Sequence, residues 1–321
     1  MALPSSLTNR LRLPVVAAPM FLISGPEMVI AACKSGILGS FPALNHRTTE
    51  GFDQWCTGIE EALGDDPNAA PYGVNLIVHR SNPRLQADLE VCIKHKVPVI
   101  ITSLGAVPEL IEAVHSYGGL VFHDVTNRRH AAKAAAAGVD GLIAVCAGAG
   151  GHAGEVNPLA LVAEIREFFD KTLLLSGCIS SGSDVAAALQ MGADLAYMGT
   201  RFINVKESQA PEEYQQMIID CGTKDIVYSA AVSGVPANFM WPSLAEAGFT
   251  KEMLKETAEI DFGKELTPPK EGAKAWKTIW SAGQGCVAVK DVPTMAELTD
   301  RLSEEFRAAI LRQQQLLQTY A

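Results

Sequence analysis

Short apolar runs alternate with amphipathic segments from Pro14 to Ile203, and this alternation predicts the fold. The runs are rich in β-branched residues and are not interleaved with polar ones, as expected of strands buried on both faces. Eight strands are predicted, over residues 15–18, 38–41, 73–78, 97–102, 120–123, 141–145, 173–176 and 195–199. Seven helices are predicted between them, over residues 26–34, 49–63, 83–95, 108–117, 128–136, 158–169 and 183–191.

A helix between each pair of successive strands predicts parallel pairing, because every crossover returns the chain to the same edge. Eight such units in about 190 residues match a (β/α)8 barrel in number and size. A doubly wound sheet is the alternative, but it usually has five or six strands. We therefore expect a (β/α)8 TIM barrel over residues 1–205.

The regular alternation stops after Ile203, which predicts a mostly helical C-terminal extension over residues 206–321. The pattern indicates a helix over 207–220, a strand over 225–232 and a loop over 233–242. A long terminal helix follows from Thr294 to about Gln318, with apolar residues at helical spacing. We expect the extension to act as a lid on the barrel, and the terminal helix to pack on the barrel or on a second subunit of a homodimer.

Composition excludes several other classes of protein. The chain has 321 residues, of which 48% are hydrophobic and 19% charged, as in a compact soluble protein. Its net charge of −10 argues against nucleic acid or an anionic membrane as the main partner. No apolar run approaches the roughly 18–20 residues of a membrane span, and no signal peptide is visible, so we expect a cytoplasmic protein. The seven cysteines form no Cys-x-x-Cys pair, which indicates neither a disulfide framework nor a zinc site.

One histidine, His152, lies among glycines in the segment from Gly148 to Gly154, directly after the sixth predicted strand. Active sites of (β/α)8 barrels lie at the C-terminal ends of the strands. Glycine allows a ligand to approach the backbone closely, and imidazole transfers protons near neutral pH. A tight turn with a hydrogen-bonded surface histidine is the alternative. We expect no metal site, because no second ligand accompanies His152 at a suitable spacing.

The loops after the seventh and eighth strands have the composition of a phosphate site. Ser176-Gly177-Cys178-Ile179 opens a helix, and Gly199-Thr200 follows the last strand. Glycine-rich turns expose backbone N–H groups, and a helix N-terminus attracts anions. The usual phosphate site of these barrels is built from the same two loops.

The other strand ends extend this site to a planar ligand. Asn75 is an amide inside an apolar run, suited to the polar edge of a heteroaromatic ring; a structural Asn that bonds neighbouring backbone is the alternative. Ala18-Pro19-Met20 places backbone at the barrel mouth. A phosphorylated heterocycle fits these features, and FMN fits better than a sugar phosphate. The candidate cofactor-binding residues are Ala18, Pro19, Met20, Asn75, Gly151, Ser176, Gly177, Cys178, Ile179, Gly199 and Thr200.

These motifs, taken in order, resemble the nitronate monooxygenase family, formerly called 2-nitropropane dioxygenases. The resemblance extends from about Pro14 to Trp241 and includes Gly234-Val235-Pro236-Ala237-Asn238 after the barrel. It implies non-covalent FMN, with His152 as the catalytic base. Two positions depart from the pattern. Many relatives have Glu where this chain has Gly148, and some reductase relatives have Lys where this chain has Asp124.

The resemblance implies FMN-dependent oxidation of alkyl nitronates by O2 to carbonyl compounds and nitrite. The alternatives are an NAD(P)H-dependent FMN reductase of quinones or enoyl thioesters, and a non-enzymatic flavin-binding barrel. Phe239, Met240 or Trp241 would form an apolar roof for small nitro compounds, or would pack against the barrel instead.

Overall fold

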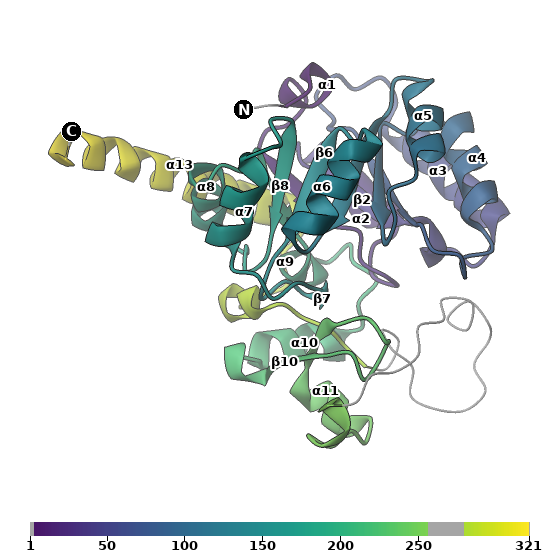
Figure 1. The fold of residues 1–321 in the computed structure, drawn as a ribbon. Coiled ribbons are helices and arrows are strands. Elements are labelled where there is room, and N and C mark those ends of the chain that lie inside the picture. Colours follow the sequence, from purple (N-terminus) through teal and green to yellow (C-terminus); the bar gives the residue numbers. More distant parts are fainter. Residues whose placement is uncertain (1–2, 256–278, 321) are drawn as a thin grey trace.

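In a computed structural model, which describes residues 3–255 and 279–320, the first two thirds of the chain form a closed parallel barrel. Its strand order is β1-β2-β3-β4-β5-β6-β8-β9, and every neighbouring pair is parallel, including β9 with β1. The (β/α)8 barrel expected from the sequence is therefore confirmed. Figure 1 shows the helices around the barrel and the C-terminal extension across one end of it.

The eight barrel strands lie within two residues of their predicted bounds. They are β1 (Val15–Ala17), β2 (Leu38–Pro42), β3 (Gly73–Ile77), β4 (Val99–Ser103), β5 (Leu120–Val125), β6 (Gly141–Val145), β8 (Thr172–Ser176) and β9 (Leu195–Met198). The helices are α1 (Ser5–Thr8), α2 (Pro26–Lys34), α3 (Thr49–Leu63), α4 (Leu85–Lys94), α5 (Pro108–His115), α6 (Arg128–Ala137), α7 (Pro158–Arg166), α8 (Gly182–Gln190) and α9 (Thr200–Ile203). Pro26, Pro108 and Pro158 lie in the first turn of their helices, where a missing N–H costs no hydrogen bond.

The barrel strands are buried on both faces, which explains their continuous apolar sequence. Side chains such as Val16, Ile101, Phe122 and Leu174 fill the barrel interior. The other face of each strand packs against the surrounding helices in a larger core. Because successive side chains of a strand alternate between the two faces, the residue two positions after an interior side chain also points inward.

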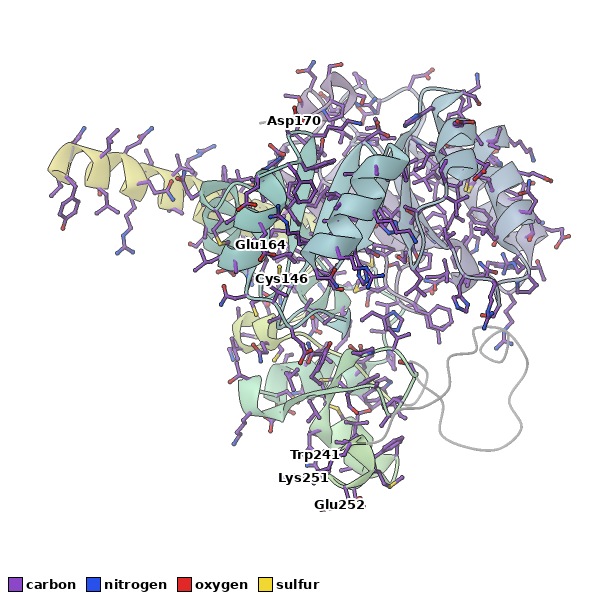
Figure 2. All side chains as sticks on the ribbon, in the orientation of Figure 1. Cys146, Glu164, Asp170, Trp241, Lys251 and Glu252 are labelled. Atoms are coloured by element: carbon purple, nitrogen blue, oxygen red, sulfur yellow. The ribbon has the colours of Figure 1, made fainter. Side chains whose placement is uncertain are left out.

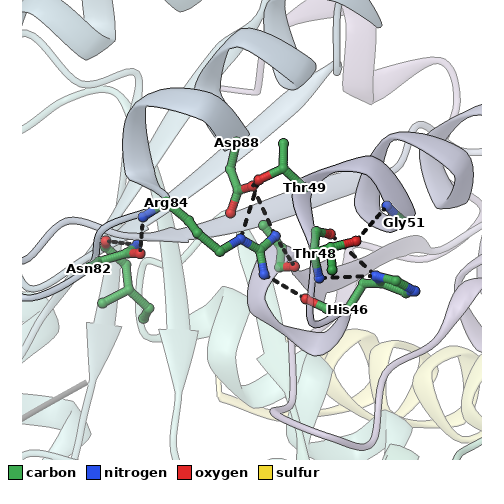
Figure 3. A network of polar contacts seen from close by, with 9 residues as sticks. His46, Thr48, Thr49, Gly51, Asn82, Arg84 and Asp88 are labelled. Carbon is green, nitrogen blue, oxygen red and sulfur yellow. Dashed lines mark hydrogen bonds and ion pairs between the residues drawn. The ribbon is translucent and has the colours of Figure 1, made fainter. Parts of the chain in front are cut away.

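Arg84 ties together the loops at one side of the barrel mouth (Figure 3). Its guanidinium donates to the carbonyl oxygen of His46 at 2.6 Å and to that of Ala43 at 3.5 Å. It also forms an ion pair with Asp88 at 2.9 Å, and Thr49 donates to the same carboxylate at 2.8 Å. This network joins the segment after β2 to the start of α4 and so holds the rim of the mouth.

The extension is mostly helical but also contains a small sheet. Its elements are α10 (Glu212–Asp220), β10 (Ile226–Ser229), β11 (Ala237–Met240), α11 (Trp241–Glu246) and α13 (Met295–Tyr320), with short 3-10 turns at Thr223–Asp225, Met253–Lys255 and Gln284–Ala288. The loop expected over 233–242 is wrong at its C-terminal half, where β11 pairs antiparallel with β10 and with the short strand β7 (Gly151–His152). This segment is a strand because it pairs with β7, which is distant in the sequence, and a local sequence pattern does not show such a partner.

The terminal helix α13 packs its first half against α8 and α2 of the barrel. Its last turns extend away from the body of the protein (Figure 1), and Leu317 and Tyr320 are exposed there. No helix in the described part of the chain is long and apolar enough to cross a membrane.

Candidate active site

A cavity of about 800 Å³ lies at the C-terminal ends of the barrel strands. All twelve residues proposed from the sequence line it: His152 and the eleven candidate cofactor-binding residues, Ala18, Pro19, Met20, Asn75, Gly151, Ser176, Gly177, Cys178, Ile179, Gly199 and Thr200. They come from the ends of β1, β3, β8 and β9 and from β7. The parallel barrel brings them together because it directs every strand end to the same mouth.

The end of the cavity formed by the loops after β8 and β9 has the shape of an anion cradle. Gly177 and Cys178 have φ angles of 133° and 59°, which turn the chain sharply after β8. Cys178 is strained in this left-handed region, where non-glycine residues are uncommon. A Cβ on Gly199 would lie 3.7 Å from Met20 Sδ and 3.9 Å from Ala18 Cβ, so only a ligand would meet it at closer range.

The N-terminus of α8 contributes less to this cradle than its sequence suggests. Asp184 Oδ2 accepts from the backbone N–H groups of Ser180 and Ser181 at 3.0 and 2.9 Å, and Glu305 Oε2 accepts from Gly182 N–H at 2.7 Å. These carboxylates occupy the free amides of the first turn, as in a capping box. A phosphate therefore has to rely on the preceding loop and on hydroxyl groups.

Two hydroxyl groups are suited to an anion at this end. Ser180 Oγ is buried and has no hydrogen-bond partner in the described part of the chain. Thr200 Oγ1 accepts from Gly283 N–H at 2.8 Å, which leaves its own proton to donate. A phosphate group fits this set, because buried hydroxyls without partners are costly and an oxyanion would satisfy them.

The floor of the cavity is a polar layer at the top of the barrel interior. Asn75, Ser103 and Asp124 each lie two residues beyond an inward-facing position of their strand and form one hydrogen-bonded chain. Asn75 Nδ2 donates to Ser103 Oγ at 2.9 Å and to the Ile101 carbonyl at 3.1 Å. Ser103 Oγ in turn donates to Asp124 Oδ2 at 2.5 Å. The amide hydrogens of Asn75 are thus engaged by protein, and its carbonyl oxygen is the group left to face a ligand.

Asp124 is a buried acid without a cationic partner among the described residues. Its Oδ1 has no hydrogen-bond partner there. Burial raises the pKa of Asp124 to about 6, although the hydrogen bond from Ser103 opposes this shift. The carboxylate also contributes to the raised pKa of the Tyr197 phenol, whose main cause is burial. The floor therefore offers the neutral carbonyl oxygen of Asn75 and one titratable acid, in place of the lysine found in some reductase relatives.

His152 reaches the cavity from β7, which pairs with β11 of the extension. Its register partner is Ala237, and Gly151 is paired with Asn238. Burial lowers the pKa of His152 to about 4. The imidazole is therefore neutral at physiological pH, the state in which it can accept a proton.

The glycine-rich loop before His152 is held by side chains and backbone of the extension. Asn238 Nδ2 donates to the Ala149 carbonyl at 2.7 Å, and Gly151 N–H donates to Ser281 Oγ at 2.7 Å. Gln284 N–H donates to the Gly148 carbonyl at 2.9 Å. The extension thus fixes the position of His152 relative to the barrel.

Gly148, one of the two departures from the family pattern, lies where a side chain would collide. Its φ angle is 80°, and a Cβ would lie 2.4 Å from Cys178 Sγ and 2.9 Å from Gln284 Oε1. The glutamate of many relatives cannot occupy this position here without displacing both neighbours. Gly148 and Cys178 are therefore sterically coupled.

The apolar roof expected from Phe239, Met240 or Trp241 is wrong. Phe239 and Met240 are fully buried and do not line the cavity. Phe239 lies in a core of the extension, whereas Met240 shares a core with Ile23 and Ile203 of the barrel, as the packing alternative expects. Trp241 lies at the far end of the extension, with the Lys251 ammonium 5.8 Å from its ring centroid (Figure 2). The strand β11 buries these side chains, and the cavity is lined from this side by Tyr228, Val235 and Pro236 instead.

The sequence reasoning missed the segment Ser281–Gly285, which also lines the cavity through Ser281, Gly283 and Gly285. A Cβ on Gly283 would lie 2.5 Å from the Gly148 carbonyl oxygen, so this close backbone approach requires glycine. The closely spaced glycines in Ser281-Ala282-Gly283-Gln284-Gly285 were the available signal. Nothing in their spacing indicated the barrel loop that they contact.

Comparison with known proteins agrees with this fold. The chain is 28% identical over 351 residues to a nitronate monooxygenase of Paraburkholderia phytofirmans, covering 92% of this chain and 93% of that protein. It is 29% identical over 294 residues to the (3aS,4S,5R,7aS)-5-hydroxy-7a-methyl-1-oxo-octahydro-1H-indene-4-carboxyl-CoA dehydrogenase of Rhodococcus jostii, covering 90% and 76%. The solved structure of a nitroalkane oxidase from Streptomyces ansochromogenes has the same fold, with a TM-score of 0.80, 24% identity and coverage of 96% and 99%.

A family model described as nitronate monooxygenase matches residues 84–305, more than half of the chain. With the barrel and its relatives, this match defines the protein as a flavin-dependent oxidoreductase of the (β/α)8 class. It belongs to the nitronate monooxygenase family.

Proposed function

We propose that the protein binds FMN and uses it to oxidise alkyl nitronates with O2. The observation that carries this proposal is the meeting of three features in one cavity. These are the anion cradle around Gly177 and Gly199, the amide floor at Asn75, and the neutral base His152. Family membership supports a flavin, and the cradle supports a cofactor with a phosphate.

The residues have separate roles in this proposal. Gly177, Cys178, Ile179, Gly199 and Thr200, with the hydroxyl of Ser180, would hold the phosphate. The flavin ring would lie against the backbone at Ala18, Pro19 and Met20 and against Asn75, with Gly151 and Ser176 beside it. Bound FMN would supply electron transfer from the substrate to oxygen.

His152 would act on the substrate. In its neutral form it would take the α-proton of a nitroalkane at its ring nitrogen and so form the nitronate. An anionic product would then offset the burial that disfavours the imidazolium. Without an external reductant, one O2 would serve two nitronates: each gains one oxygen atom as its carbonyl oxygen, its C–N bond breaks, and the nitrogen leaves with its two oxygens as nitrite.

Oxygen uptake with ethylnitronate, measured together with nitrite release, tests this proposal. We expect equal amounts of carbonyl compound and nitrite, and none from protein that has been stripped of flavin. Absence of nitrite from the flavin-loaded protein would exclude it.

One observation favours a second candidate. The Rhodococcus jostii relative is named as a dehydrogenase of a carboxyl-CoA compound, which raises a thioester oxidoreductase as the alternative. Anaerobic mixing with NADH tests the nicotinamide-linked form of this alternative: rapid bleaching of the yellow protein would indicate a reductase, and unchanged absorbance would exclude it.

A further inference from the structure

The active-site cavity continues beyond the floor to the first turns of α6. There it is lined by Thr126, Asn127, His130, Lys133 and Ala134. His130 and Lys133 are three residues apart and therefore lie on the same face of the helix. This end is built from other loops than the phosphate cradle, which lies at β8 and β9.

This end of the cavity borders a basic helix, in a protein that is acidic overall. α6 holds Arg128, Arg129, His130 and Lys133 and has no acidic residue, whereas the whole chain has a net charge of −10. Arg128 is engaged in an ion pair with Glu167 on the protein surface. In the described part of the chain Lys133 has no acidic partner, so its charge is available to a ligand.

His130 is oriented by its own helix cap. The Asn127 side chain accepts from His130 N–H at 2.9 Å, and His130 Nδ1 lies 3.2 Å from Asn127 Nδ2 and 3.3 Å from Thr126 Oγ1. Burial is the main cause of the lowered pKa of His123 in the cavity wall, and the nearby His130 and Lys133 lower it further. Both His130 and Lys133 are exposed side chains that line this end of the cavity. The acids that also line the cavity are Asp124, bonded to Ser103, and the exposed Glu155.

We propose that Lys133 and His130 bind an anionic group of the substrate, a carboxylate or a phosphate, while its reacting carbon lies at His152. The assignment rests on the proposed function and names the substrate class: nitro compounds or thioesters that carry a second, anionic end. It replaces the expectation of small, wholly apolar nitro compounds, because an apolar ligand that covered the exposed Lys133 ammonium would remove its water without offering it a partner.

Two nitronates that differ by one carboxylate test this site. Propionate 3-nitronate carries the second anion and ethylnitronate does not. For Lys133→Gln we expect kcat/KM to fall about three- to fivefold for propionate 3-nitronate and to stay nearly unchanged for ethylnitronate, since a contact between exposed charges contributes only modestly. Arg129→Gln is the matched control, because it removes the same charge from an exposed position of α6 outside the cavity. An equal loss for both nitronates, or the same loss in Arg129→Gln, would overturn the proposal.

Binding measurements keep the test independent of turnover. Titration of the yellow protein with coenzyme A or with glutarate, followed by the change in flavin absorbance, reports phosphate and carboxylate binding separately. We expect Lys133→Glu to weaken at least one of them about tenfold or more while Arg129→Glu does not. Loss of binding for coenzyme A alone identifies a phosphate-bearing substrate, and loss for glutarate alone identifies a carboxylate-bearing one.

The failure of the anion site and the failure of the proposed function are distinguishable. If no nitrite forms from either nitronate but the Lys133-dependent binding persists, the proposed nitronate activity is wrong and the anion site stands. If the binding of neither coenzyme A nor glutarate depends on Lys133, and kcat/KM changes equally for the two nitronates, the proposed anion site is wrong.

Discussion

Ser103 Oγ donates a 2.5 Å hydrogen bond to Asp124 Oδ2 on the floor of the active-site cavity. This bond satisfies one carboxylate oxygen and leaves Oδ1 buried without a partner in the described structure. Burial outweighs the hydrogen bond and raises the pKa of Asp124. An ionised carboxylate that is buried in this way lowers the free energy of unfolding. Substitution of Asp124 therefore tests the electrostatics of the cavity floor.

Replacing Asp124 by Asn is expected to stabilise the protein at pH 8 and not at pH 4. The pKa is raised to about 6 in the folded state, so the folded protein holds the proton more tightly than the unfolded chain. Stability from this group is full below about pH 4 and is lost as the pH rises through 6. The gain at pH 8 is about 3 kcal/mol at most. Urea unfolding at both pH values measures it, with the exposed Asp65→Asn as control. A gain of equal size at pH 4 would contradict a titrating Asp124.

His152→Ala is expected to slow nitroalkane oxidation by about 10²–10⁴-fold and nitronate oxidation much less, because only the former needs proton abstraction. The wild-type rate with nitroethane is expected to persist down to about pH 5, since burial lowers the pKa of His152 to about 4. Steady-state oxygen uptake across pH measures both effects, with the exposed His115→Gln as control. Unchanged rates in His152→Ala with FMN bound would exclude the base.

Gly199→Ala is expected to fold normally and to bind FMN at least about tenfold more weakly. The added Cβ meets Met20 and Ala18 at ordinary contact distance, but it takes up space at a position that lines the cavity, in the proposed cofactor site. The ratio of flavin to protein absorbance and the thermal midpoint without flavin separate the two effects. Gly58→Ala, whose Cβ meets nothing within 4 Å, is the control. Unaltered flavin affinity would place the phosphate elsewhere.

Gly148→Ala is expected to destabilise the protein by about 1–3 kcal/mol, through its positive φ and the clash with Cys178 Sγ. Adding Cys178→Ala should restore part of this loss, because it removes the atom 2.4 Å from the new Cβ. Thermal unfolding of the two single variants and the double variant measures the coupling. Strictly additive losses would show that the backbone conformation alone requires glycine.

The sequence by itself determined the barrel and most of the strand ends that carry the site. Parallel strands that are buried on both faces have continuous apolar sequences. Because one helix connects each pair of successive strands, all the strands run in the same direction. The positions of Gly177, Gly199, Asn75 and His152 at one mouth follow from that direction, since all strand ends meet there.

Only the tertiary structure decided which distant segments complete the cavity. The segment Ser281–Gly285 and the strand β11 reach the loop of His152 through contacts of high sequence separation, and these leave no local pattern. The same contacts bury Phe239 and Met240 and exclude them from the roof. Burial also sets the charge states of His152 and Asp124, because desolvation depends on the complete surroundings of a group and not on its neighbours along the chain.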